Sequence, residues 1–295
     1  MLTRHWELRR KTVSVNLILS ERKMENIKID MIMKNLDSLK IKMTSEEFAN
    51  FALENELTQQ DLDAISKVFD LLAKRKDEAS IQMMLKLSKL PLKSPKTFEN
   101  FNFAEVHGKN TDQLKGLQTL STLYSHRNIA LIGPAGTGKT HFAMAYGYEC
   151  CQHKLKTYFV KMTELNDMFT EARQYGKTGK LITSLVKPSC LIIDEVGHCV
   201  FDKENTRMFF DLVDRRYNKE GPYTMIFTSN KQPSQWKQNF CEDDSLLCAL
   251  DRIFDDALIF NLRGNSYRGR NCESYSLTTI RGKATNADLS APTTK

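Results

Sequence analysis

The sequence predicts an α/β fold, in which a three-layer domain surrounds a parallel sheet and follows a small all-helical domain. Three observations support it. Five short apolar runs lie in the second part of the chain, stretches of helical periodicity separate them, and a glycine-rich loop directly follows the first run. Parallel strands joined by helices are buried on both faces, which accounts for runs that are apolar at successive positions.

The first part of the chain predicts an extension and a helical domain. Residues 1–26 do not fit the pattern that follows, and Met24 opens a segment typical of a natural start, so we expect a disordered extension there. Residues 27–95 predict helices: Thr44 and Glu47 form a capping-box pattern, and apolar residues recur at helical spacing over 62–72 and again over about 78–90. These apolar stripes indicate a bundle core or a docking face rather than a cofactor site.

The five apolar runs predict the strands of the second domain, from about residue 96 to 270. They cover residues 128–133, 157–162, 190–194, 224–229 and 258–262. Helical stretches between them imply right-handed crossovers between parallel strands. Residues 271–295 are polar and rich in Ser, Thr and Asn, so we expect a disordered tail.

Composition narrows the class of protein. The 43 Lys and Arg residues outnumber the 36 Asp and Glu residues, giving a net charge of +7, which favours a polyanionic partner such as nucleic acid without proving one. No apolar run is long enough to span a membrane, and the basic N-terminus lacks the pattern of a signal peptide. The seven cysteines lack metal-binding spacing. We therefore expect a cytoplasmic protein with reduced, mostly buried thiols, Cys190 and Cys248 among them.

The glycine-rich loop has the pattern of a phosphate-binding P-loop, G-x-x-x-x-G-K-[ST]. It comprises Gly133, Pro134, Ala135, Gly136, Thr137, Gly138, Lys139 and Thr140. A predicted strand precedes the loop and a helical pattern follows it, as phosphate binding at a helix N-terminus requires. We expect the loop to bind ATP, with Lys139 reaching the β- and γ-phosphates and Thr140 binding Mg²⁺.

Acidic and polar residues end the third and fourth runs. Asp194 and Glu195 close the third run, and ligands of parallel sheets bind at this edge. We expect Asp194 to hold Mg²⁺, directly or through water, and Glu195 to orient and deprotonate the attacking water. Asn230, which follows the fourth run, is the expected sensor of the γ-phosphate; a plain strand-ending turn is the alternative.

Longer segments carry a family resemblance. They are GPAGTGKTHFAMA (133–145), CLIIDEVG (190–197), FFDLVDRRY (209–217), TSNKQPSQW (228–236) and ALDRIFDDALIFNLRGNSYR (249–268). Together with the lead-in KTFENFNF (96–103), they resemble the IstB-like transposition helper ATPases, which are close to the DnaC-type helicase loaders. The resemblance covers residues 27–270, and LRGNSYR is much more specific to this family than the P-loop.

The resemblance implies a P-loop AAA+ domain of the initiator clade with sheet order 5-1-4-3-2. It also implies a homo-oligomer that assembles on DNA with ATP and recruits a transposase. Arg252, after Asp251, matches the family's arginine finger, which reaches the neighbouring subunit's nucleotide. A salt bridge from Arg252 to Asp251 or Asp255 within one subunit is the alternative. Relatives often have Tyr-Leu-Pro at the position of His198-Cys199-Val200, which leaves the hydrolysis rate open.

Residues 164–187 predict two helices between the second and third strands. In the initiator clade an extra helix at this place drives spiral assembly and faces DNA. Arg173, Lys177 and Lys180 are the candidate DNA contacts, through phosphates and without sequence preference, although such a run often forms only a solvated face.

Three functions remain open on the sequence. The first is a transposition helper that delivers DNA to a transposase. The second is a loader for a replicative helicase, built on the same ATPase. The third, a P-loop kinase for a small molecule, is the weakest, because Asp194, Glu195 and Arg252 suit water activation and subunit coupling.

Overall fold

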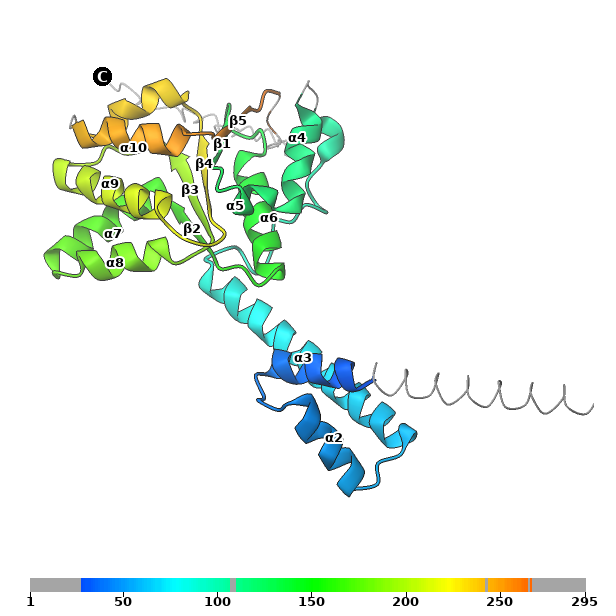
Figure 1. Cartoon of the computed structure of the whole chain (residues 1–295). Coiled ribbons are helices and arrows are strands. Elements are labelled where there is room, and N and C mark those ends of the chain that lie inside the picture. The colour runs from blue at the N-terminus through cyan, green and yellow to red at the C-terminus, as the bar shows by residue number, and fades with distance from the viewer. Residues whose placement is uncertain (1–27, 107–109, 242–243, 265, 267–295) are drawn as a thin grey trace, which may run out of the picture.

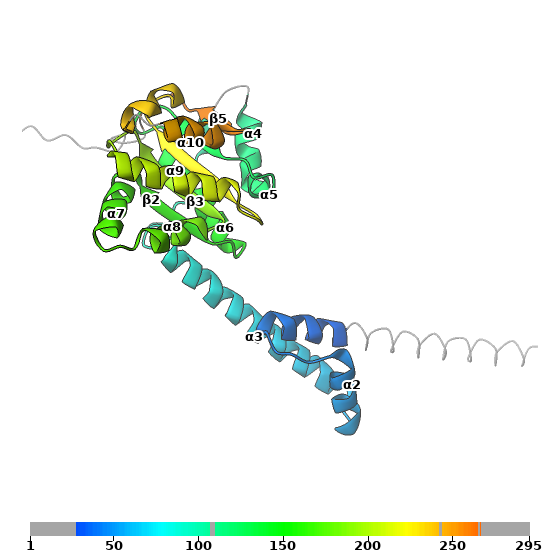
Figure 2. The ribbon, with the colours of Figure 1, turned by 60° about the vertical axis from the view of Figure 1, so that its left-hand side comes forward.

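The computed structural model describes residues 28–106, 110–241, 244–264 and 266 (Figure 1). An N-terminal group of helices stands apart from an α/β domain, and the long helix α3 joins the two (Figures 1 and 2). The expected disordered extension, residues 1–26, and the expected tail, residues 271–295, lie outside the described residues. The expected domain boundary near residue 95 stays a prediction.

A five-stranded parallel sheet forms the centre of the α/β domain. Its strands are β1 (Ile129–Ile132), β2 (Thr157–Lys161), β3 (Cys190–Val196), β4 (Thr224–Ser229) and β5 (Leu258–Asn261). Their order across the sheet is β2-β3-β4-β1-β5, with every neighbouring pair parallel. Read from the other edge, this is the expected order 5-1-4-3-2, and each expected strand exists within two residues of its expected ends.

Helices cover both faces of the sheet and complete three layers. One face packs against α7 (Met162–Gln174), α8 (Thr178–Val186), α9 (Lys203–Tyr217) and α10 (Asp244–Phe254). The other face packs against α6 (Lys139–Gln152) and the short helices α4 (Thr111–Gly116) and α5 (Ser121–Tyr124). Successive strand residues point to opposite faces, so Ala130 and Ile132 lie in one core while Ile129 and Leu131 lie in the other. Short 3₁₀ turns occur at Phe103–Glu105, Leu117–Thr119 and Pro233–Asn239.

The N-terminal helices form a small bundle. Residues 28–39 are helical, and α2 (Ser45–Glu54) and α3 (Gln59–Leu87) follow. The expected capping box before α2 is confirmed: the Glu47 amide donates to Thr44 Oγ1 (3.1 Å) and the Thr44 amide donates to Glu47 Oε2 (2.7 Å). Ile32, Leu36, Phe48 and Leu62 are the buried core of this bundle.

Helix α3 is one helix where we expected two. It runs for 29 residues without a break, because the polar stretch Ala73–Asp77 consists mainly of good helix formers. A second capping box, Thr58 with Asp61, begins it. Its second half packs on α6 and β2, and Asp77 forms an ion pair with Lys154 at 2.6 Å. The polar gap in the apolar pattern therefore marks an exposed stretch of helix rather than its end.

The described part of the chain shows the state of its cysteines and the length of its apolar helices. No helix there is long and apolar enough to cross a bilayer. Every cysteine in this part is a free thiol; Cys150, Cys151 and Cys190 are buried. Cys248 is exposed, so its expected burial is wrong: it lies on the outer side of α10, whereas the next residue, Ala249, points into the core.

Candidate nucleotide-binding site

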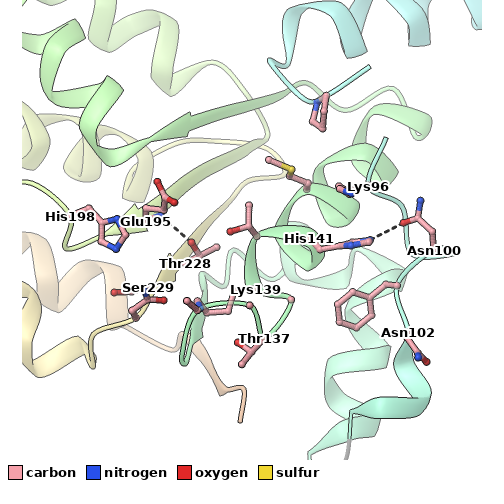
Figure 3. A pocket seen from close by; sticks show the side chains of 18 residues that line it. Lys96, Asn100, Asn102, Thr137, Lys139, His141, Glu195, His198, Thr228 and Ser229 are labelled. Atoms are coloured by element: carbon pink, nitrogen blue, oxygen red, sulfur yellow. Dashed lines mark hydrogen bonds between the residues drawn. The ribbon is translucent and has the colours of Figure 1, made fainter. Parts of the chain in front are cut away.

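A cavity of about 610 Å³ opens at the carboxyl edge of the sheet (Figure 3). Three parts of the chain surround it: the P-loop with the first turn of α6, the ends of β3 and β4, and the segment between α3 and α4. The lining includes Lys139, Thr140, Glu195, Thr228 and Asn230. The residues predicted for phosphate binding and hydrolysis therefore meet at one cavity.

The P-loop has the backbone that its glycines allow. Gly136 and Gly138 have φ angles of 80° and 88°, which residues with a Cβ atom rarely adopt. Helix α6 begins directly after, at Lys139, so its free amides face the loop. Lys139 is 7% exposed, and its ammonium donates to the carbonyls of Gly133 and Pro134, at 2.7 Å each. The cation is thereby held at the mouth of the loop.

Asp194 joins three elements of the site. Its Oδ1 accepts hydrogen bonds from Thr140 Oγ1 at 2.8 Å and from Thr228 Oγ1 at 2.5 Å, and the residue is only 2% exposed. Thr140 comes from the start of α6, Asp194 from β3 and Thr228 from β4. A hydroxyl beside a carboxylate is the kind of oxygen pair that Mg²⁺ prefers, so Thr140 and Asp194 fit the expected metal.

Glu195 is held by its backbone and by an ion pair. Its φ angle is +59°, an uncommon left-handed conformation at a residue other than glycine. The Glu195 amide donates to Thr228 Oγ1 at 3.0 Å, and its Oε2 lies 3.2 Å from Lys161 Nζ at the end of β2. The regular pairing of β3 with β4 breaks between Ile193 and Val196, which turns Glu195 toward the cavity (Figure 3).

The fourth strand contributes a residue that the sequence analysis missed. Asn230, the expected sensor, is exposed and lines the cavity, and its role stays a prediction. Thr228 holds both Asp194 and Glu195, although it stands in the same Thr-Ser-Asn segment. Its partners come from β3, the neighbouring strand of the sheet, so the local sequence held no signal for this role.

The segment between α3 and α4 closes the other side of the cavity. Asn100, Phe101 and Asn102 line it, opposite His141 from the first turn of α6 (Figure 3). His141 Nε2 lies 2.7 Å from Asn100 Oδ1 and 3.3 Å from the carbonyl of Thr97. Burial lowers the pKa of His141, which favours a neutral ring near pH 7. In the sequence this segment carries only a family resemblance, and its contact with the cavity was not predicted.

A comparison with models of protein families shows the family of this chain. The model of IstB-like ATP binding proteins matches residues 32–274. The chain belongs to this family. The parallel sheet, its strand order and the P-loop are those of a P-loop AAA+ fold.

Individual relatives agree with the family assignment. An ATP-binding protein of insertion sequence IS5376 from Geobacillus stearothermophilus is 37% identical over 66% of this chain and 76% of its own length. The corresponding protein of IS21 from Pseudomonas aeruginosa is 27% identical over 86% of this chain and 88% of its own length. Among solved structures, DnaI matches with a TM-score of 0.49 and 16% identity, covering 63% of this chain and 99% of DnaI.

Arg252, the candidate arginine finger, forms an ion pair within its own subunit. Its Nη2 lies 3.2 Å from Asp214 Oδ1 on α9, and its guanidinium stacks 5.3 Å from the centre of the Phe210 ring. Its Nη1 is buried without a hydrogen-bond partner among the described residues. We had expected Asp251 or Asp255 as the alternative partners, and neither pairs with it; the hydroxyl of Tyr217 donates to Asp255 instead. The action of Arg252 in a neighbouring IstB-like subunit stays a prediction.

The three candidate DNA contacts have different surroundings. Residues 164–187 contain α7 and α8, as expected. Arg173 is engaged within this IstB-like fold: its Nη1 donates to both carboxylate oxygens of Asp202, at 2.8 Å each, and to Asn205. Lys177 and Lys180 are exposed beside a shallow, mainly apolar groove between α7 and α8. The two lysines are therefore better placed for DNA than Arg173.

Proposed function

We propose that this chain is a Mg²⁺-dependent ATPase that assembles on DNA as a homo-oligomer and acts on a transposase. One observation supports the ATPase most directly. Thr140 and Asp194 are hydrogen-bonded at 2.8 Å, and Glu195, the next residue, faces the cavity that the P-loop also lines. A phosphate group, a metal ion and a base for water can thus occupy one site.

Nucleotide binding follows from the donors around the P-loop. The backbone amides at the start of α6 and the ammonium of Lys139 point positive charge toward the loop, where the β- and γ-phosphates would lie. Thr140 and Asp194 would hold Mg²⁺, which neutralises phosphate charge when bound. Asn100, Phe101, Asn102 and the neutral His141 would surround the rest of the nucleotide.

Hydrolysis requires a base beside the γ-phosphate. Glu195 would take a proton from a water molecule whose oxygen attacks the γ-phosphorus, while the bond from phosphorus to the departing ADP oxygen breaks. Lys161 Nζ lies 3.2 Å from Glu195 Oε2, so the ion pair helps to fix the position of the carboxylate that would accept this proton. Asn230 would donate to the γ-phosphate from the other side of the cavity.

Glu195→Gln separates binding from hydrolysis. The variant keeps the shape of the side chain but cannot accept the proton, so we expect near-normal ATP affinity and a hydrolysis rate lower by about 100-fold or more. Lys139→Ala should instead lose measurable ATP binding. Fluorescent ATP titration and phosphate release measure the two quantities.

A matched control is available on α6. Glu149→Gln makes the same chemical change about 15 Å along that helix from Lys139 and should leave both quantities unchanged. Normal turnover in Glu195→Gln would show that another group is the base. Normal ATP affinity in Lys139→Ala would refute the P-loop site itself.

The proposed partner follows from the family. Its named relatives are ATP-binding proteins of insertion sequences, so we propose a transposase as the partner and transposition as the process. Because ATP and DNA occur together in the cytoplasm, we place the protein there. A transposase gene next to the gene of this chain, and co-purification of its product with this protein, would support the proposal. Co-purification with a hexameric helicase would favour the helicase-loader alternative.

Lys177 and Lys180 supply the DNA prediction. If each contacts a phosphate, Lys177→Ala and Lys180→Ala should each lower the slope of log affinity against log salt by about 1, equally for different sequences. Anisotropy of labelled duplexes at several salt concentrations measures this slope. Lys115→Ala removes an exposed lysine from α4, on the other face of the sheet, and should leave the slope unchanged. Unchanged slopes in all three variants would place the DNA elsewhere.

A further inference from the structure

The residues that follow β5 run beside the P-loop. Strand β5 pairs with β1 in parallel register, so that Asn261 lies opposite Ile132, the last residue before the P-loop. The Leu262 amide then donates to the Ile132 carbonyl at 2.7 Å. The P-loop and the residues after β5 therefore leave neighbouring strands at the same edge of the sheet. We call the described residues Leu262, Arg263, Gly264 and Ser266 the strap. The strap falls within the LRGNSYR segment that carries part of the family resemblance.

Two P-loop glycines touch the strap so closely that no larger residue fits. A Cβ on Gly136 would overlap Ser266 Oγ and would lie 2.7 Å from Ser266 Cβ and 3.0 Å from Ser266 Cα. Rotation of the serine side chain cannot relieve this overlap, because Cβ and Cα do not move with it. A Cβ on Gly133 would overlap the carbonyl oxygen of Leu262. Backbone and side chain of the strap thus fill the space directly behind the loop.

The strap lies outside the nucleotide cavity. Leu262 and Ser266 are not among the residues that line it, whereas Gly136 and Gly138 are. The loop is therefore enclosed between the cavity on one side and the strap on the other. A loop with a backing surface has fewer accessible conformations, so less conformational entropy is lost when a phosphate binds.

The strap is also connected to other parts of the site. Asn261, just before the strap, accepts a hydrogen bond from Gln232 Nε2 at 3.3 Å, which links it to the turn after Asn230. On its N-terminal side, β5 follows α10, which carries Arg252. The segment from β5 to the strap thus contacts the P-loop and the turn after Asn230. It also continues directly from α10, the helix that carries the candidate arginine finger.

We propose that the strap, through Leu262 and Ser266, holds the P-loop in its phosphate-binding shape, with Ser266 as a positioning residue for nucleotide binding. This inference rests on the proposed function, because it assigns the strap a role in ATP affinity. Gly136 is then required for two reasons: its positive φ angle and the strap behind it. The proposal predicts that the effects of mutations at Gly136 and Ser266 on ATP affinity are coupled, although Ser266 does not line the nucleotide cavity.

A double-mutant cycle tests this coupling. Gly136→Ala should weaken binding of a fluorescent ATP analogue by about tenfold or more, because it adds both backbone strain and the overlap with Ser266. Ser266→Gly should weaken binding by about threefold through a looser strap. In the Ser266→Gly background, Gly136→Ala should cost at least about threefold less than in the wild-type background.

Gly138→Ala provides the matched control. Gly138 has a similar φ angle of 88°, but a Cβ there would meet the Phe101 ring at 3.2 Å and no atom of the strap. Its effect on ATP affinity should therefore be equal in the wild-type and Ser266→Gly backgrounds. If Gly136→Ala proves unfolded by circular dichroism, Ser266→Val replaces it, and its larger side chain should weaken ATP binding while the P-loop sequence stays intact.

The outcomes distinguish the strap from the ATPase itself. The proposed role of the strap would be wrong if Gly136→Ala weakened ATP binding equally in the two backgrounds, or if Ser266→Val left ATP affinity unchanged. Neither result would contradict the proposed ATPase. A wild-type chain that binds no ATP would overturn the proposed function and the strap's role with it. Coupling that appears equally at Gly138 would also overturn the strap, because it would reflect a general loosening of the loop.

Discussion

Asp194 depends on hydroxyl groups from two other elements. Thr140 and Thr228 both donate to the same carboxylate oxygen, and Thr228 also accepts from the Glu195 amide. One threonine side chain thus fixes the expected metal ligand and the backbone of the expected base. Because Asp194 and Thr228 are almost fully buried, water cannot replace these bonds.

Thr228→Val tests this arrangement. Valine keeps the shape of the side chain but loses the hydroxyl, so Asp194 loses a donor and the Glu195 amide loses its acceptor. We expect the free energy of unfolding to fall by about 1–3 kcal/mol and ATP hydrolysis to fall by about tenfold or more. Chemical denaturation and phosphate release measure the two effects.

Thr122→Val controls for the loss of a buried threonine hydroxyl. Thr122 is 3% exposed and bonds to the Tyr146 hydroxyl at 2.5 Å, away from the nucleotide cavity. The Thr122→Val variant should have a lower free energy of unfolding but the same hydrolysis rate per folded molecule. Full activity in Thr228→Val would leave Thr228 with a structural role only.

The sequence predicts some residues of the site better than others. The P-loop and the Asp194-Glu195 pair were predictable because a motif and a strand end place them at one edge of the sheet. Lys161, Thr228 and Asp214 were not predicted, because each finds its partner across the sheet or on another helix. Such contacts depend on register and packing, which a local pattern does not contain.

At the scale of elements, two cations near the end of α9 hold together the segments that lead into β3 and β4. Arg216 lies in the last turn of α9, and Lys219 lies two residues beyond the helix. Arg216 is fully buried and donates to five carbonyls, which belong to Leu185, Val186, Pro188, Ser189 and Thr224. Lys219 donates to the carbonyls of Lys187 and Pro188, at 3.0 and 2.9 Å. Together they tie the end of α8 to the starts of β3 and β4. Carbonyls that a loop leaves unpaired are satisfied here by side chains from a neighbouring helix.

Lys219 predicts a dependence of stability on pH. Burial, with a smaller contribution from the charge of Arg216, lowers the pKa of Lys219 to about 8, below the value of about 10.4 expected in the unfolded chain. Between these values the unfolded chain binds more protons than the folded chain, so the free energy of unfolding should rise with pH. Urea denaturation of wild type and Lys219→Met at pH 7.5, 8.5 and 9.5 measures this contribution. Wild type should gain stability relative to the variant as pH increases, and a constant difference would contradict the prediction.

Elements differed in how well the sequence predicted them. The strands were predictable because buried parallel strands need apolar residues on both faces. Helix α3 was wrongly divided, because its middle is exposed and polar while the helix continues on backbone hydrogen bonds and propensity alone. Apolar periodicity reports which parts of a helix are buried, and not where the helix ends.

At the scale of the whole molecule, α3 connects the N-terminal bundle to the nucleotide site. Its 29 residues span about 44 Å. Leu62 near its start belongs to the bundle core, whereas Leu85 near its end is buried, and the Phe159 amide of β2 donates to the Ser88 carbonyl at 2.8 Å. Pro91, three residues later, lines the cavity. The bundle is therefore held at a distance from the α/β domain by a helix whose end lies near the cavity (Figure 2).

Arg252 lies away from the nucleotide cavity of its own subunit. Its ion pair with Asp214 and its contact with Phe210 hold it on the α9–α10 face, and it is not among the residues lining its own cavity. A guanidinium with a buried, unpaired Nη1 among the described residues can gain hydrogen bonds by turning toward a neighbour's phosphates. We therefore predict that Arg252 completes the site of an adjacent copy.

Mixing two inactive variants tests this prediction. Arg252→Ala keeps a P-loop but lacks the guanidinium, and Lys139→Ala has the reverse defect, so each alone should hydrolyse ATP at least about 1000-fold more slowly than wild type. Random 1:1 mixing creates intact sites at about a quarter of head-to-tail interfaces, and ATPase activity should recover to that order when DNA is present. If the only role of Arg252 is the ion pair with Asp214 in its own subunit, the mixture will be as inactive as its components. Asp214→Ala, which removes the acceptor and keeps Arg252, should then also be inactive, whereas an arginine that acts in the neighbouring copy predicts that Asp214→Ala remains active.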